Sequence, residues 1–132
     1  MKIAIPVVNE RVAPRFGISN TLLIATEENG EILSRKMVSL TEMSPFEKIR
    51  YIKNNEIKVL ICLGIEMTLY NYLNAFGVQV IPGIYGYVEE ILKLYLTGDL
   101  ISGPLPGPGF CYRVRARRGF RGGRGYQPFD SF

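Results

Sequence analysis

The stretch SPFEKIRYIKNNEIKVLICLG, residues 44–64, joins a helix pattern directly to an apolar strand pattern. Ser44 can cap a helix, Pro45 suits its first turn, and Glu47 completes the reciprocal hydrogen bonds of a capping box. The spacing predicts a helix from 44 to about 54, with a buried face formed by Phe46, Ile49 and Ile52. The short apolar run at 58–63 predicts a buried strand. A helix followed at once by such a strand indicates an α/β fold.

Upstream of this stretch the chain reads as three strands. The runs at 2–8 and 21–27 predict two strands, and the second is apolar on consecutive positions, which favours burial on both faces. Asn29-Gly30 suits the positive φ angles of a type I′ turn, so 21–28 and 31–39 are expected to form a hairpin.

Downstream the helix and strand patterns alternate. A helix at about 66–76 is expected to bury Leu69, Leu73 and Phe76, and a strand at 78–81 and a helix at about 86–97 follow it. The predicted order is β-β-β-α-β-α-β-α, which gives a five-stranded mixed sheet with helices packed on it. The strands at 2–8 and 58–63 are expected to be central.

Charge divides the chain into two parts. Residues 1–102 hold ten Lys/Arg and eleven Asp/Glu, whereas residues 103–132 hold six Arg and one Asp. We therefore predict a neutral folded domain at 1–102 and a basic tail rich in Gly, Pro and aromatic residues at 103–132. No apolar run approaches the roughly 20 residues of a membrane span, and the first residues do not resemble a secretory signal. We expect a cytoplasmic protein without a membrane partner.

The missing residue types argue against an enzyme. The chain has no histidine, and its two aspartates are Asp99 and Asp130. Histidine is the commonest general base, and two-metal nucleases need clustered carboxylates, one of them normally on the first strand. Cys62 and Cys111 are the only soft metal ligands, and Cys62 lies in an apolar run where a small buried side chain is the simpler interpretation. The metal-binding residues, if any, stay unknown from these patterns.

Several motifs together resemble one known family. The chain opens with KIAIP and continues with VAPRFGISNTLLIATEENGEI, then KVLICLGIE, and finally GVQVIPGIYGYVEEILKLYLTGDL. In order and spacing these segments are similar to the dinitrogenase iron-molybdenum cofactor biosynthesis family, which includes NifX-like and NafY-like accessory proteins. The resemblance covers about residues 1–100 and implies a ribonuclease-H-like α/β fold. It also implies a non-enzymatic protein that binds an iron-sulfur or iron-molybdenum-type cluster, or another small anionic ligand, and meets cluster-assembly proteins.

The sequence departs from the family pattern at the expected site. Arg15 stands where the family usually has histidine, and Leu63-Gly64-Ile65-Glu66 replaces a Gly-Gly-Ile-Gly-like loop. Under the family fold, the loop at 9–20 lies beside the loops at 64–66 and 82–86, at strand ends where open α/β sheets bind ligands. The candidate ligand-binding residues are Arg11, Arg15, Phe16, Gly17, Gly64, Ile65, Gly83 and Gly86.

Two interpretations of Arg15 and Phe16 stay open. Arg15 can hold an anion by charge and forked hydrogen bonds. Alternatively, Arg15 is a solvated surface residue and Phe16 simply packs on the sheet edge.

The basic tail carries an alternative function. Arginine, glycine and aromatic residues alternate there as in RGG-type segments that bind RNA. The residues expected to contact RNA or an acidic protein are Arg113, Arg115, Arg117, Arg118, Phe120, Arg121, Arg124 and Tyr126. In this alternative the chain is an interaction module that acts through its tail.

Overall fold

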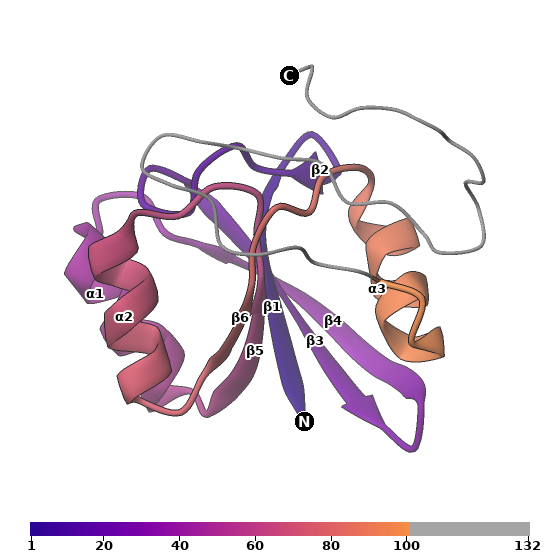
Figure 1. Ribbon diagram of the computed structural model, residues 1–132. Coiled ribbons are helices and arrows are strands. Elements are labelled where there is room, and N and C mark those ends of the chain that lie inside the picture. The colour runs from indigo at the N-terminus through magenta and orange to yellow at the C-terminus, as the bar shows by residue number, and fades with distance from the viewer. Residues whose placement is uncertain (101–132) are drawn as a thin grey trace.

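The computed structural model describes residues 1–100 and forms a mixed sheet between two helical layers (Figure 1). The strands are β1 (Lys2–Val8), β2 (Arg11–Val12), β3 (Thr21–Glu28), β4 (Glu31–Ser39), β5 (Ile57–Ile61) and β6 (Gln79–Ile81). The main sheet runs β4-β3-β1-β5-β6, and β2 pairs with β1 outside this path. β1 pairs antiparallel with β3 and parallel with β5, so the sheet is mixed as predicted.

The predicted hairpin is confirmed, and a second, shorter one was missed. Asn29 and Gly30 have φ angles of 54° and 82°, and the strands on either side pair from Thr21↔Ser39 to Glu28↔Glu31. β2 is only two residues long and follows a turn at Asn9 and Glu10, whose φ angles of 52° and 70° are also positive. The sheet therefore has six strands rather than five.

The three helices are α1 (Pro45–Asn54), α2 (Met67–Ala75) and α3 (Val88–Thr97). Ser44 and Glu47 form the predicted capping box of α1. In Figure 1, α1 and α2 cover one face of the sheet and α3 covers the other. The central strands β1 and β5 supply buried side chains to both layers, as their apolar runs predicted.

Two aromatic residues predicted to be buried are half-exposed. Phe46 precedes Ile52 by six residues, and at 100° per residue this places it about 120° from Ile52 around the helix. Its ring is 50% exposed and instead meets Tyr72 edge-to-face at 5.4 Å between ring centroids. Phe76 lies at the C-cap of α2, beyond its last turn, and is 43% exposed.

An ion pair joins the edge strand β4 to α3. Arg35 donates from Nε and Nη2 to the two carboxylate oxygens of Glu89, both at 2.8 Å.

Between residues 1 and 100, no helix is long and apolar enough to cross a membrane.

Candidate functional site

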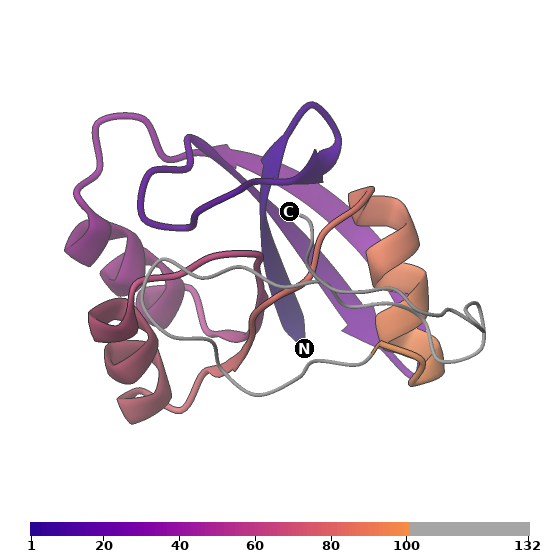
Figure 2. The ribbon, with the colours of Figure 1, turned by 45° about the horizontal axis from the view of Figure 1, so that its top comes forward.

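Three loops meet at one end of the sheet, where the parallel strands β5 and β6 end (Figure 2). The backbone N–H of Phe16 donates to the carbonyl of Gly64 at 2.9 Å, and the N–H of Gly64 donates to Pro14 at 3.0 Å. The N–H of Gly83 donates to Leu63 at 2.9 Å. Together with the bond from the N–H of Val12 to the carbonyl of Gly86, these bonds place the 9–20 loop beside the 64–66 and 82–86 loops, as the family resemblance implied.

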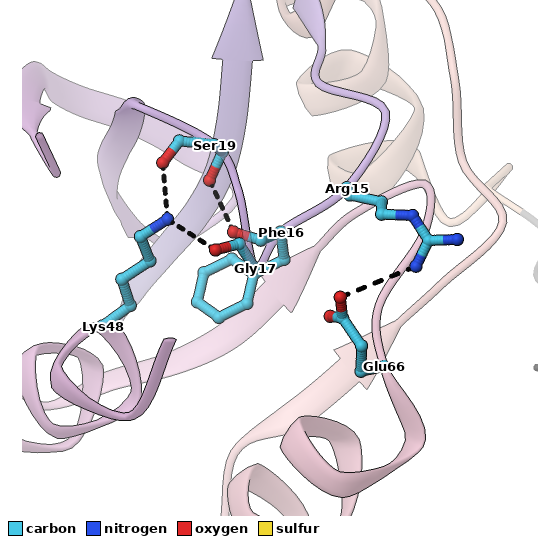
Figure 3. Close-up of polar contacts among 6 residues, drawn as sticks. All are labelled: Arg15, Phe16, Gly17, Ser19, Lys48 and Glu66. Carbon is cyan, nitrogen blue, oxygen red and sulfur yellow. Dashed lines mark hydrogen bonds and ion pairs between the residues drawn. The ribbon is translucent and has the colours of Figure 1, made fainter. Parts of the chain in front are cut away.

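Arg15 lies at the surface of this loop cluster. Its guanidinium Nη1 is 3.6 Å from a carboxylate oxygen of Glu66, with the two side chains 37% and 44% exposed (Figure 3). At that distance and exposure the ion pair is weak, because both charges stay hydrated. Arg15 therefore keeps most of its hydrogen-bonding capacity for another anion.

Gly17 makes room for the Glu66 carboxylate. A Cβ atom on residue 17 would lie 2.8 Å from Oε1 of Glu66 and 3.2 Å from Oε2. The carboxylate thus rests directly against the backbone of the Arg15 loop. Glu66 is also the N-cap residue of α2, yet its side chain accepts no capping hydrogen bond from that helix.

A buried lysine fixes the inner side of the same loop. Nζ of Lys48, on α1, donates to the carbonyls of Gly17 at 2.8 Å and Ser19 at 2.7 Å, and only 3% of Lys48 is exposed (Figure 3). The hydroxyl of Ser19 donates to the carbonyl of Phe16 at 2.7 Å. Burial lowers the pKa of the Lys48 ammonium, and the negative charge of Glu66 partly opposes this shift.

The remaining candidates fall into different surroundings. The ring of Phe16 is fully buried in the core, so it packs in the interior and cannot reach a ligand in solvent. Arg11 stacks over Tyr87, with its guanidinium carbon 4.6 Å from the ring centroid, and donates to the hydroxyl at 3.0 Å.

The loop glycines contribute through their backbone. Gly64 and Gly83 are buried, and Gly86 accepts from Val12 through its carbonyl at 2.9 Å. Ile65 is half-buried against the core.

Direct metal ligation has little support in residues 1–100. No group of three His, Cys, Asp or Glu side chains in that range could hold a metal ion. Cys62 is fully buried, and burial raises the pKa of its thiol far above the usual range. Cys111 and the arginine and aromatic candidates of the tail lie outside the described residues. An open groove of about 410 Å³ beside α1 shares no lining residue with the Arg15 loop.

Sequence reasoning missed two parts of this site. Lys48 carried no signal, because a single lysine on an amphipathic helix usually faces solvent. Glu66 stood out only as a replacement for glycine, and nothing in the sequence placed its carboxylate against Gly17.

Known proteins share both the fold and the sequence pattern. The family described as "Dinitrogenase iron-molybdenum cofactor" matches residues 1–98, and the chain belongs to that family. An uncharacterized protein of Methanocaldococcus jannaschii, MJ0580, is 29% identical over 105 residues, which span 76% of this chain and 89% of that protein.

Solved structures confirm the α/β fold. The crystal structure of PH0822 superposes with a TM-score of 0.72 at 20% identity, over 90% of this chain and 96% of that one. The apo form of the orange protein from Desulfovibrio gigas gives a TM-score of 0.65 at 17% identity, over 80% of this chain and 95% of that one.

Proposed function

We propose that this chain is a non-enzymatic accessory protein that binds a small anionic ligand at the Arg15 loop. The family suggests that the ligand is an iron-sulfur or iron-molybdenum-type cluster. The observation that carries the proposal is the placement of Arg15, half-exposed and only weakly paired, where the parallel strands end. Ligands of open α/β sheets bind in this position.

The available residues favour binding of the cluster as an intact anion. Histidine is absent from the chain, and Cys62 is sealed in the core. A guanidinium, in contrast, offers several N–H donors to sulfide or oxygen atoms at the surface of a cluster whose metal coordination is already complete. The cluster is then a cargo received from, and passed to, cluster-assembly proteins.

The test is anaerobic loading. The full-length chain is mixed with a preformed molybdenum–iron–sulfur cluster, or with iron and sulfide, and passed through gel filtration at low salt. We expect a chromophore to elute with the wild type and about tenfold less with Arg15→Gln. Arg35→Gln is the matched control, since Arg35 is also a paired surface arginine but lies on β4 and contacts α3. Equal retention by the two variants, or none by the wild type, would contradict the proposal.

The alternative function rests on the charge of the tail. Residues 103–132 carry a net charge of +5, against −1 for residues 1–102. Such a segment attracts RNA or an acidic protein surface. Deleting residues 107–132 separates the two functions, because ligand binding at Arg15 should survive the deletion and tail-dependent partner binding should not.

A further inference from the structure

Glu66 is the N-cap residue of α2, a position that shorter side chains such as Ser, Thr, Asp and Asn usually occupy. Its carboxylate turns away from α2, although the first turn of that helix has N–H groups that a cap normally binds. The carboxylate instead lies against Gly17 and 3.6 Å from Arg15. It therefore fills the space beside the one guanidinium to which we assign ligand binding.

The charges around Glu66 favour this position of its carboxylate. Arg15 lies on its solvent side, and the buried ammonium of Lys48 lies on the inner side of the same loop. The attraction to Arg15 is weak because both side chains are more than one-third exposed, and the positive charge of Lys48 adds to it from inside the loop. Gly17 lets the carboxylate come close, because any larger residue would put a Cβ atom within 2.8 Å of Oε1.

We propose that Glu66 is a built-in competitor for the anion site. Its carboxylate occupies the place beside Arg15 and over Gly17 that the ligand takes, so the ligand must displace it. This inference rests on the proposed function. The single negative charge of Glu66 also favours ligands of higher charge, since these gain more from Arg15 than the carboxylate that they displace.

The geometry suits exchange rather than permanent pairing. The Arg15–Glu66 contact is long, and both side chains are more than one-third exposed. Arg35 and Glu89 show the contrasting case, with two hydrogen bonds of 2.8 Å between fork-shaped partners. A pair of that kind stabilises the contact of two elements, whereas the Arg15–Glu66 pair leaves the carboxylate free to swing into solvent.

The experiment measures binding of tetrathiomolybdate, a molybdenum–sulfur dianion with a visible chromophore, to the full chain at about 20 mM salt. Glu66→Gln keeps the shape of the side chain and removes its charge. Removing one like charge near a dianion should tighten binding by about 3- to 10-fold at this ionic strength. Glu89→Gln is the matched control and should change the affinity by less than about 2-fold.

A double variant shows whether the gain acts through Arg15. In Arg15→Gln/Glu66→Gln the affinity should fall below that of the wild type, because the guanidinium is gone. Suppose that binding by the wild type depends on Arg15 but does not tighten in Glu66→Gln. This result would contradict the role of Glu66 as a competitor and would still support anion binding at Arg15. Absence of binding in the wild type and in Glu66→Gln alike would overturn both.

Discussion

Lys48 shows how one buried cation shapes the candidate site. Its ammonium satisfies two carbonyls, those of Gly17 and Ser19, in a loop that has little regular structure. Buried carbonyls without donors are costly, so the lysine stabilises this particular turn of the chain. The cost is the burial of a charge, and burial accordingly lowers the pKa of Lys48. A neutral amine still has two N–H donors, which is the number that the two carbonyls need.

We therefore expect Lys48 to stabilise the fold more at high pH. At pH values below the lowered pKa of Lys48 in the folded protein, Lys48 is protonated in both the folded and the unfolded states. The folded state then bears the full cost of burying the charge. Between that value and the ordinary pKa near 10.5, the unfolded state binds more protons, so the free energy of unfolding rises with pH. Urea unfolding from pH 7 to 10.5 should show Lys48→Met destabilised by about 1–3 kcal/mol at neutral pH, and by more as pH rises.

The control for this measurement is Lys53→Met, on the exposed side of the same helix. The difference between wild type and Lys53→Met should stay nearly constant with pH. A Lys48→Met difference that is equally flat would show that the ammonium is not destabilised by burial.

At this scale the sequence predicted only part of the site. The choice of Arg15 as a candidate and the proximity of its loop to the 64–66 loop followed from the family resemblance. The burial of Lys48 and Phe16 did not follow, because both depend on how a loop folds over α1, and loop conformation has no periodic pattern. The prediction for Phe46 was wrong because two successive steps of three residues do not return to the same side of a helix, so Phe46 and Ile52 face different directions.

The elements of this fold begin and end at local signals. Ser44 accepts from the N–H of Glu47 at 3.2 Å, and Glu47 Oε1 accepts from the N–H of Ser44 at 2.7 Å. This box fixes where α1 starts and hence where Lys48 points. Such signals involve residues close in sequence, which is why the helices and the Asn29-Gly30 hairpin were predictable. β2 was not, because a two-residue strand after Asn9-Glu10 carries no glycine and no apolar run.

Removing this cap should cost about 1 kcal/mol. Ser44→Ala deletes the acceptor for the N–H of Glu47, and losses at N-caps are typically 0.5 to about 2 kcal/mol. Ser44→Asn keeps an acceptor and should stay within about 0.5 kcal/mol of the wild type. Urea midpoints of the three proteins provide the measurement. If the alanine and asparagine variants were equally stable, the cap would contribute nothing to α1.

The net positive charge of the molecule comes from its last thirty residues. The sheet and its helices lie within residues 1–100, and the family match ends at residue 98. Apolar runs predicted that β1 and β5 are central, but they could not give the full order of strands in the sheet, since several sheets accommodate the same runs. The fold of residues 1–100 does not explain the six arginines of residues 103–132. Their role has to be tested by how binding to a negatively charged partner depends on salt.

The tail predicts salt-dependent binding to single-stranded RNA. If about four of its arginines contact phosphates, counterion release of ~0.7 per contact gives a log–log salt slope near −3. Affinity should then fall roughly 50-fold between 50 and 200 mM salt, while a chain lacking residues 107–132 should hardly bind.

The aromatic residues of the tail allow a second test. Phe120→Ala and Tyr126→Ala should each weaken binding by about 1–3 kcal/mol if the rings stack on bases, and by almost nothing if charge acts alone. Fluorescence anisotropy of a labelled RNA at three salt concentrations measures both effects. Equal, weak binding by the full-length and shortened chains would exclude RNA as the partner of the tail.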